Sequence, residues 1–469
     1  MRNTTYKTTL AALSSAILLA ACSGSGSSDS SASSDRTVQG TVDGFGSVIV
    51  NGVHYVSSGA EFSIDDRAGV ESDLRVGQVV TITGSDDGAE GVANSIVYDV
   101  GVEGPVSAID VAAGTFVILG TTVVTDAMTV FEGVTLDTMT VGQGIEVSGY
   151  ADSNGQLLAT FVKVDDSGEA ELRGRITNLD EAALTFTIRN QVISYASVET
   201  LDLKEASLRN DLLVEVEGTV EGDVLVASKI EQEDGHHFRG HDGDIRLNGY
   251  ITALTDTSMT VGDTEVLLTS STEFEHGSSA DLALNVFVKV EGEMNADGVL
   301  VADEVKFADK VKLELEGPVS AVSDTTVTVM GVTATVDTNT RVRDERDDIT
   351  YFNLSDLSAG DYVELRLTEE ADGSYRALRL ERDDADTEVK ITAPVSAVDV
   401  ATTTITMLGI TVDMSALTLV DLSTLVIGGY LEVKGTYDGS IVTATEAGED
   451  DRYEEHDGHG EHENEHEDD

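Results

Sequence analysis

The chain of 469 residues carries 28 Lys and Arg against 87 Asp and Glu, a formal net charge of −59 at pH 7. A field of that sign repels phosphate backbones, which excludes nucleic acid as an expected partner. It attracts cations and basic partners, although the same charge also serves plain solubility. Tryptophan is absent, aromatic residues make up 5% and glycines number 45, a composition that fits twisted β-structure with many turns.

The first 21 residues have the pattern of a lipoprotein signal peptide. Arg2 and Lys7 form a basic start, and residues 8–21 form an apolar run that is too short for a membrane-spanning helix. The run leads into LAAC at residues 19–22, which resembles the lipobox of bacterial lipoproteins. The resemblance implies diacylation of the Cys22 thiol, cleavage before Cys22 and acylation of the new amino terminus. A plain secretory signal followed by a chance cysteine is the alternative.

Lipidation predicts an exported protein anchored to the membrane of the cell envelope. Several acyl chains together give lasting attachment, where one chain would not. Ser23, and not aspartate, follows Cys22, and by resemblance to the sorting rule of enteric bacteria this favours the outer membrane. Residues 22–36 are rich in Ser and Gly, and we expect a flexible coil through Asp35. Because Cys22 is the only cysteine, the mature chain has no thiol for a disulfide or for catalysis.

Six tandem repeats occupy most of the remaining chain. Each has a small residue in an early strand: Gly40, Gly104, Gly174, Gly249, Gly317 and Ala393. A second anchor ends a later strand: Gly84, Gly149, Gly218, Gly292, Thr368 and Gly435. Five of the six separations between paired anchors fall between 42 and 45 residues, and the fifth repeat is longer because of a charged insertion at 341–348. Self-similarity at a fixed period indicates copies of one structural unit.

A turn dipeptide and the prolines support the same alignment of the repeats. The dipeptides are Asp87-Gly88, Asn154-Gly155, Glu221-Gly222, Asp297-Gly298, Asp372-Gly373 and Asp438-Gly439. Such pairs tolerate the positive backbone φ that tight hairpins need. The three prolines, Pro105, Pro318 and Pro394, share one repeat position, where proline can start or edge a strand.

The second repeat serves as the model for the unit. We expect strands at residues 102–109, 115–119, 121–125, 144–150 and 157–164. In the equivalents of its long connection, Asp281-Leu282 and Asp356-Leu357 have the pattern of a helix N-cap and first turn. Three strands, a short helical plug and a hairpin is the order of an OB-like five-stranded barrel. A small non-OB β-barrel or a sandwich is the rival architecture.

The predicted fold is therefore all-β: six tandem, small, OB-like, five-stranded β-barrel repeats, with a disordered N-terminal tether and a disordered acidic C-terminal tail. The predicted repeats are residues 37–99, 100–166, 167–232, 245–309, 310–384 and 385–446. A His-containing linker at 233–244 is the longest join and the expected hinge. The acidic tail covers 447–469.

Three motifs of the second repeat carry a resemblance to a known family. They are GPVSAID at 104–110, the strand VGxxxEVxG at 141–149 and LAT at 158–160. With these motifs the repeat resembles the domain of unknown function 5666 family, and the resemblance covers most of residues 37–446. It implies an exported, anchored, β-rich protein. The motifs are turns and core positions, so the resemblance implies no activity and no catalytic residue.

Histidines in the acidic segments are the candidate metal ligands. Four stand in the tail and three in the linker: His456, His459, His462, His466, His236, His237 and His241. Neutral imidazole with carboxylate oxygen can bind Zn²⁺, Ni²⁺ or Cu²⁺, and so acidic a chain can also bind Ca²⁺ without a defined site. A solvated acidic tail with incidental histidines is the alternative, because such tracts are compositional signals only.

The sequence contains no G-x-S-x-G elbow and no Gly-rich phosphate loop, and His54 and His276 stand alone in their repeats. We therefore expect no enzyme but an anchored binding or spacer module, with an envelope protein or polysaccharide as ligand. Divalent-cation binding through the His-bearing segments is the first alternative. The second is an envelope enzyme with an unrecognised carboxylate site, which predicts a polar pocket with perturbed carboxylates in one repeat only.

Overall fold

The computed structural model describes residues 34–204, 207–233, 243–417 and 422–449. Within these ranges it contains 36 strands and four 3₁₀ turns, and no segment forms an α-helix. The predicted all-β fold is therefore confirmed. No helix in the described part of the chain is long and apolar enough to cross a membrane.

The first three repeats follow one order of strands. The first contains β1 (Ser34–Gly44), β2 (Val48–Val50), β3 (Val53–Val56), β4 (Glu61–Ile64), β5 (Arg67–Ala68), η1 (Glu71–Asp73), β6 (Val79–Asp86) and β7 (Glu90–Tyr98). The second contains β8 (Val102–Asp110), β9 (Thr115–Ile118), β10 (Thr121–Val124), β11 (Val130–Glu132), β12 (Gly144–Ala151) and β13 (Leu157–Val164). The third contains β14 (Ala170–Asp180), β15 (Thr185–Ile188), β16 (Gln191–Ser194), β17 (Thr200–Asp202), β18 (Leu213–Glu221) and β19 (Val224–Gln232).

The fourth and fifth repeats keep this order, and the described residues of the sixth keep it without the short strand after the third barrel strand. The fourth contains β20 (Asp244–Leu254), β21 (Ser258–Val261), β22 (Thr264–Leu267), β23 (Glu273–Glu275), η2 (Ser279–Asp281), β24 (Phe287–Met294) and β25 (Leu300–Phe307). The fifth contains β26 (Leu313–Val322), β27 (Thr326–Val329), β28 (Val332–Thr335), β29 (Arg341–Asp344), η3 (Leu354–Asp356), β30 (Tyr362–Glu369) and β31 (Tyr375–Asp383). The sixth contains β32 (Glu388–Asp399), β33 (Thr404–Met407), β34 (Ile410–Asp413), η4 (Leu422–Thr424), β35 (Tyr430–Tyr437) and β36 (Ile441–Glu449).

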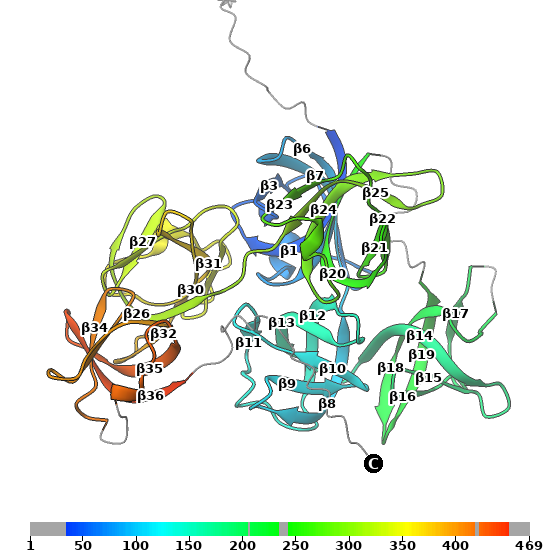
Figure 1. Cartoon of the computed structure of the whole chain (residues 1–469). Helices are drawn as coiled ribbons and strands as arrows, with labels where there is room; N and C mark the ends of the chain where they lie inside the picture. The colour runs from blue at the N-terminus through cyan, green and yellow to red at the C-terminus, as the bar shows by residue number, and fades with distance from the viewer. Residues whose placement is uncertain (1–33, 205–206, 234–242, 418–421, 450–469) are drawn as a thin grey trace, which may run out of the picture. The chain divides into compact units, whose positions relative to one another are not determined.

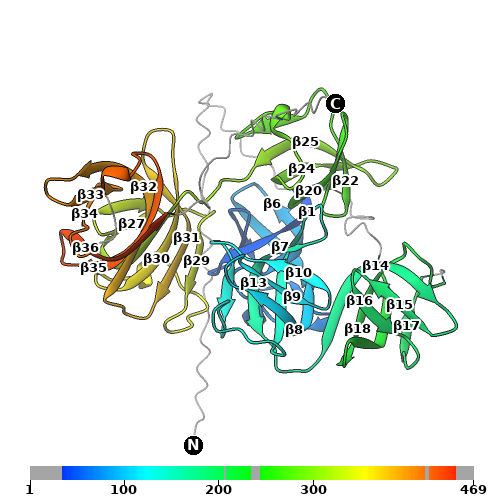
Figure 2. The same ribbon diagram turned by 60° about the horizontal axis from the view of Figure 1, so that its bottom comes forward.

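Each repeat closes into a barrel, as the second repeat illustrates (Figure 1). Strand β8 pairs with β9, β9 with β10, β10 with β13, β13 with β12, and β12 with β8 again. Among these five barrel pairs, β10 and β13 run parallel and the other four are antiparallel. The other repeats have the same cyclic order. Figure 2 shows strands of the third repeat, among them β14, β15, β16 and β18, gathered in one unit. This is the five-stranded barrel of the OB type, so the closed pairing excludes the rival sandwich.

The long connection between the third and fourth barrel strands differs from the prediction. In the first five repeats it adds a short strand that pairs in parallel with the last barrel strand: β4, β11, β17, β23 and β29. The predicted N-caps Asp281 and Asp356 are wrong, because each aspartate is the last residue of its 3₁₀ turn. The caps are Ser278 and Asn353, whose backbone N–H groups donate to those aspartates at 2.8 and 3.0 Å.

A β-bulge explains the second glycine anchor. The register shifts at Gly84, Gly149, Gly218, Gly292 and Gly435, where the neighbouring strand presses a carbonyl against the glycine. A Cβ built at Gly292 would lie 2.0 Å from the carbonyl oxygen of Val301, which no side chain tolerates. In the fifth repeat the register shifts at Leu367. The second anchor, which the sequence placed at Thr368, therefore lies one residue earlier in the chain.

The predicted turn glycines are confirmed. Their φ angles are positive in all six hairpins, from 64° at Gly222 to 101° at Gly439. These residues adopt the left-handed region that glycine reaches without strain.

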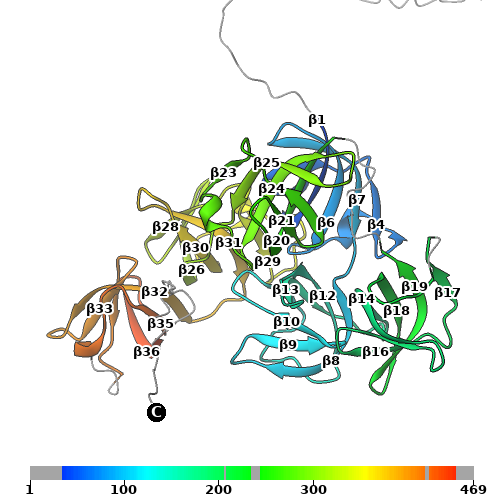
Figure 3. The same cartoon turned by 45° about the vertical axis from the view of Figure 1, so that its right-hand side comes forward.

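First strands also pair between barrels and join the repeats two by two. Strand β8 pairs antiparallel with β14, and β26 pairs antiparallel with β32 (Figure 3). We call these the second–third seam and the fifth–sixth seam. In both seams the residues that face each other stand two places before the first anchors, Val102 with Leu172 and Leu315 with Ile391. The two seams are therefore equivalent position by position.

The first repeat pairs with the fourth, across more than 200 residues of chain. Strand β1 runs parallel to β20, with Arg36 opposite Asp244. Arg36 also forms ion pairs with Asp86 at 3.5 Å and with Glu291. Because β1 begins at Ser34, the flexible coil predicted through Asp35 is wrong at its end: the last linker residues belong to a paired strand.

Candidate functional site: an acidic cleft at the second–third seam

A row of charged residues crosses the second–third seam. Six strands, β13, β12, β8, β14, β18 and β19, contribute one residue each, and each residue lies directly opposite the next: Lys163, Glu146, Glu103, Glu171, Glu217 and Lys229. Directly opposed residues project from the same face of a sheet, about 5 Å apart. The four acidic members, Glu146, Glu103, Glu171 and Glu217, are called the glutamate row.

The alternation of the strands places this row outside the barrels. Val102 and Leu172, the neighbours of Glu103 and Glu171, are fully buried in the hydrophobic core that the second and third repeats share. Successive residues of a strand point to opposite faces, so the glutamates must face away from that core. The apolar positions that hold the seam together thus also fix the position of the carboxylates.

The two ends of the row are neutralised by lysine. Lys163 Nζ lies 2.6 Å from Glu146 Oε2, and the Tyr98 hydroxyl donates to Glu146 Oε1 at 2.6 Å. At the other end Lys229 Nζ lies 2.7 Å from Glu217 Oε1 and 3.0 Å from Glu231 Oε2. Both end carboxylates therefore have a close cation.

The two middle carboxylates differ. Ser167 Oγ donates to Glu103 at 3.0 Å, a neutral hydrogen bond. In the described part of the chain no lysine, arginine or histidine forms an ion pair with Glu103 or Glu171. Two acidic residues directly opposite each other, without a cation between them, destabilise a strand pair.

The pKa values of the carboxyls reflect this crowding. Burial raises the pKa of Glu171 to about 10, with repulsion from Glu215, Asp65 and Glu217 adding to it. Burial, and then Asp165, raises the pKa of Glu103 to about 8, and burial with repulsion from Glu233 raises that of Glu215 to about 8. At neutral pH the middle of the row is therefore largely protonated.

Five residues of the row, all but Lys163, line a cavity of about 620 Å³. The lining also includes the β4–β5 turn of the first repeat, residues within 165–170 at the join of the second and third repeats, and Ser197 and Glu199. Further acidic groups belong to this lining, and burial raises the pKa of Asp65 among them to about 6. The volume is that of a typical ligand site.

The fifth–sixth seam provides an internal comparison. Its equivalents of Glu103 and Glu171 are Glu316 and Lys390, which face each other directly. Lys390 Nζ lies 3.0 Å from Glu314 and 3.5 Å from both Glu316 and Glu432. The fifth–sixth seam thus has a lysine at the position where the second–third seam has the carboxylate of Glu171.

Two carboxylates of the cleft and a third beside it come close enough to hold a metal ion. Asp66, Glu215 and Glu217 each have an oxygen within 4.8 Å of the others. However, Lys229 Nζ already lies 2.7 Å from both Asp66 and Glu217. A metal ion would have to displace that ammonium group, so these residues fit an ion pair better than a free metal site.

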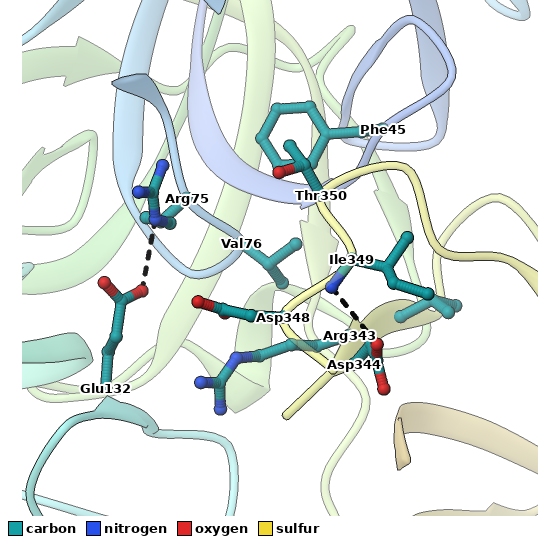
Figure 4. A pocket seen from close by; sticks show the side chains of 10 residues that line it. Phe45, Arg75, Val76, Glu132, Arg343, Asp344, Asp348, Ile349 and Thr350 are labelled. Carbon is teal, nitrogen blue, oxygen red and sulfur yellow. Dashed lines mark hydrogen bonds and ion pairs between the residues drawn. The ribbon is translucent and has the colours of Figure 1, made fainter. Parts of the chain in front are cut away.

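A second cavity, of about 50 Å³, lies among residues of the first, second and fifth repeats (Figure 4). Arg75 Nε forms an ion pair with Glu132 at 3.2 Å on one side, and Ile349 N donates to Asp344 at 3.1 Å on the other. A space of this size holds a few water molecules at most. It is too small for an organic ligand.

All site residues predicted from the sequence lie outside the described residues. This holds for Cys22, for the linker residues His236, His237 and His241, and for the four histidines of the tail. The tail also contains HENEH at 462–466, which matches the H-E-x-x-H pattern and likewise lies outside them. His54 Nδ1 lies 3.2 Å from Ser47 Oγ and His276 Nδ1 lies 3.3 Å from Asp309, and neither lines the cleft.

The sequence interpretation missed the glutamate row. Glu103 stands one place before its anchor glycine and Glu171 three places before the next, so no single alignment column contains both. Only the antiparallel pairing of β8 with β14 brings them together.

The fold and the cleft define a class of protein: a chain of OB-type barrels joined through their first strands, with one seam whose two middle glutamates, Glu103 and Glu171, form no ion pair among the described residues. The family model for the domain of unknown function DUF5666 matches residues 103–163, 173–231, 248–306, 316–381 and 392–447. These segments make up more than half of the chain, and the protein belongs to this family. The first repeat is not among them, although its strand order is the same.

The other comparisons add little. No curated protein matches the chain. The chain is similar at 12% identity to a solved structure of Drosophila Unr CSD456, with 46% of this chain and 97% of that chain covered and a TM-score of 0.12. It is similar at 12% identity to a multidomain protein with nucleic acid binding domains from Streptococcus pneumoniae, with 43% and 72% covered and a TM-score of 0.11.

Proposed function

We propose that the protein is an exported, lipid-anchored, non-catalytic binding module of the cell envelope, and that its acidic cleft takes a basic segment of another envelope protein. The observation that carries this proposal is the direct opposition of Glu103 and Glu171, neither of which forms an ion pair among the described residues, in a cavity of about 620 Å³. Ammonium or guanidinium groups from a partner would supply what Lys390 supplies in the equivalent seam.

The dimensions of the row suit an extended basic segment. Four carboxylates on adjacent strands span roughly 15 Å, since neighbouring strands lie about 4.8 Å apart. An extended peptide projects side chains to one side about every 6.6 Å, so two or three lysines or arginines would cover the row. A long-range negative field would also speed the encounter with such a partner.

Binding would have to deprotonate the middle of the row. The raised pKa values of Glu103 and Glu171 come from burial and from neighbouring carboxylates. Nearby positive charge lowers a carboxyl pKa. A cationic ligand would therefore release protons as it binds, and its affinity would rise with pH through the range of about 6 to 9.

An enzyme with a carboxylate site is the alternative that the raised pKa values favour. The cleft has the polar pocket that this alternative predicts, but perturbed carboxyls are not confined to it. Burial also raises the pKa of Glu364 and Glu345, in the fifth repeat, to about 7. We therefore retain binding as the proposal, and turnover of an added substrate in the cleft would reverse it.

Three parts of the proposal rest on sequence alone. The anchor is Cys22, the expected location is the outer membrane, and nucleic acid is not expected to bind because the net charge is −59. Loose binding of Zn²⁺, Ni²⁺, Cu²⁺ or Ca²⁺ by the histidine-bearing segments remains the cation-binding alternative.

The test is calorimetric titration of the full chain, purified in detergent, with a deca-lysine peptide at pH 8. Glu171→Lys copies Lys390 of the other seam, and we expect it to weaken binding at least tenfold. Glu90→Lys makes the same charge change at an exposed position of β7 and should weaken binding less than twofold.

Equal weakening in both variants would mean that the peptide reads only net charge, and the proposed cleft would be discarded. Heat on adding CaCl₂ or ZnCl₂, but none with the peptide, would favour the cation-binding alternative. Heat only with a neutral oligosaccharide would favour a polysaccharide ligand.

A further inference from the structure

The acidic cleft contains two basic residues of its own. Nine of the residues that line it are Asp or Glu, and Arg67 and Lys229 are its basic ones. Arg67 belongs to the hairpin that β4 and β5 form in the first repeat, and Lys229 belongs to β19 of the third. In the described part of the chain, the first repeat alone adds a second strand, β5, to its short strand. The hairpin therefore belongs to the repeat that the family model does not match.

Each of the two cations pairs with a carboxylate across the boundary between the first and third repeats. Arg67 Nη2 lies 3.2 Å from Glu169 Oε2, at the start of the third repeat. Lys229 Nζ lies 2.7 Å from Asp66 Oδ2, next to Arg67 in the hairpin. One ion pair thus has its cation on the hairpin, and the other has its carboxylate there. Two carboxylates that line the cleft, Asp66 and Glu169, are occupied before any ligand arrives.

No apolar core supports these two ion pairs. Among the described residues, the hydrophobic core of the first repeat contains no residue of the third, and the core that the second and third repeats share contains none of the first. Exposed ion pairs contribute little stability, because water screens them and holding two long side chains together costs entropy. The side chains of Arg67 and Glu169 are 71% and 60% exposed, so their pair is of this weak kind.

Both cations can leave their partners at small cost. The guanidinium of Arg67 would return to the water to which it is already largely exposed. Lys229 would keep two other carboxylates, because its Nζ also lies 2.7 Å from Glu217 and 3.0 Å from Glu231. Burial opposes the charge of Lys229, but hydrogen bonds to its three carboxylates raise its pKa above the ordinary value. It therefore competes with a ligand as an ammonium group.

The hairpin itself need not move when the cations leave. Its strand β4 pairs in parallel with β7, and the Asp65 carboxylate accepts a hydrogen bond from the Val100 backbone at 3.0 Å. The turn holds Asp65 and Asp66 at φ angles of 45° and 58°, the left-handed region that a two-residue hairpin turn requires. An exchange of cations at Asp66 therefore concerns side chains only.

We propose that Arg67 and Lys229 are internal counter-ions of the cleft, and that a cationic ligand displaces them from Glu169 and Asp66. The inference rests on the proposed function, because it takes the ligand to be cationic. It extends the contact of the ligand beyond the glutamate row to Asp66 and Glu169. The free cleft is thus partly inhibited by its own side chains, and the two internal cations set the affinity that a basic segment reaches.

Calorimetric titration of the full chain with deca-lysine at pH 8 tests this exchange. Arg67→Gln removes the exposed internal cation and should tighten binding about threefold, the size expected of one exposed ion pair. Lys229→Gln should tighten it about tenfold, because hydrogen bonds between charged groups are stronger and three carboxylates then lack their ammonium. Arg346→Gln and Lys306→Gln are the matched controls, since each makes the same charge change at a residue that pairs within its own repeat and does not line the cleft.

The controls should change the affinity less than twofold. Tightening in the controls equal to that in Arg67→Gln and Lys229→Gln would mean that net charge alone acts, and would overturn the internal counter-ions. Wild-type binding that Arg67→Gln leaves unchanged would overturn the role of Arg67, and this variant is safe to compare because its side chain is exposed.

The failure of this inference differs from the failure of the proposed function. If the inference alone fails, deca-lysine still binds the wild-type chain and Glu171→Lys still weakens that binding. If neither the wild-type chain nor either cleft variant binds deca-lysine, the proposed function is overturned and the inference with it.

Discussion

Glu103 and Glu171 lie directly opposite each other across the β8–β14 seam, with a glutamate on either side of them in the same row. The fifth–sixth seam has the same backbone register but places Glu316 opposite Lys390. Identical backbone geometry with opposite charge at one position shows that the fold does not require the acidic pair. The carboxylates of the second–third seam therefore have an explanation outside the stability of the barrels.

The acidic pair should make the second–third seam less stable as pH rises. The folded pKa of Glu171, about 10, lies above its ordinary value, so its stabilising contribution is complete near pH 4 and is lost as pH rises through 10. Glu171→Gln removes this titration. We expect the variant to gain about 1–2 kcal/mol over wild type between pH 5 and pH 9. Denaturant-dependent hydrogen exchange of β14 peptides measures it, with Glu90→Gln as the control.

A flat stability profile in wild type over the same range would contradict the raised pKa values. So would a Glu171→Gln variant that loses stability at pH 9, because the glutamate would then be ionised and favourably paired.

The reverse change should reproduce the acidic row in the other seam. Lys390→Glu removes the ammonium that lies within 3.5 Å of three glutamates, and adds a fourth carboxylate. Loss of one partner from a buried charge network typically costs about 3–5 kcal/mol, and we expect about 2–3 here because the lysine is partly exposed. Hydrogen exchange of β26 and β32 measures the loss. Lys434→Glu, whose carboxylate partners are 4.0 Å away, should cost less than half as much.

A structural feature of this chain could be predicted from the sequence when its cause lies in residues that are close together along the chain. The strands of the second repeat were predicted to within one residue at each end, because alternation and turn dipeptides are local signals. The short strand β11 was missed, since three residues carry too little periodicity. The cyclic strand order followed from the order of elements and was confirmed.

The seams could not be predicted, because nothing in β1 indicates that it pairs with β20. The fifth barrel strand illustrates the limit. We compare the residue of this strand that stands two places after the residue paired with the bulge position and faces away from the barrel core. It is Phe161 in the second repeat, Lys229 in the third and Arg379 in the fifth. Phe161 packs into the core of the first repeat, Lys229 binds Asp66, and Arg379 holds residues 127 and 129. Each residue type is explained only by the neighbour that the tertiary structure supplies.

The bulge glycines should tolerate no side chain. Gly292→Ala would place a Cβ 2.0 Å from the carbonyl oxygen of Val301 and 2.9 Å from its carbonyl carbon, both backbone atoms that cannot move alone. We expect a loss of about 2–4 kcal/mol in the fourth repeat, within the range of strained backbone substitutions. Gly59→Ala is the control, since a Cβ there meets nothing within 4 Å. Equal effects of the two substitutions on thermal unfolding would refute the steric explanation.

Asp86 should be essential for the pairing of the first and fourth repeats. Its carboxylate is fully buried, accepts from the Tyr55 hydroxyl at 2.7 Å and from Arg246 Nη1 at 3.0 Å, and lies 3.5 Å from Arg36 Nε. Asp86→Asn leaves both arginines short of a buried counter-charge, and we expect a cost of about 3 kcal/mol. The exchange of β1 and β20 amides should rise together, since the two strands separate as a pair. Glu90→Gln, exposed on the next strand, should leave both unchanged.

The last prediction concerns the proposed membrane anchor and depends on the thiol of Cys22. Cys22 carries the only thiol of the chain, so Cys22→Ser removes the proposed acceptor for a diacylglycerol group and changes no residue of the described barrels. Metabolic labelling with radioactive palmitate should mark the wild-type chain and leave the variant unlabelled. The variant should appear in the soluble fraction, because the remaining chain has no second acyl signal to hold it. A variant that stays with the membrane would mean that protein contacts, and not lipid, hold the chain there; Ser23→Ala, which leaves the thiol in place, should be labelled like wild type.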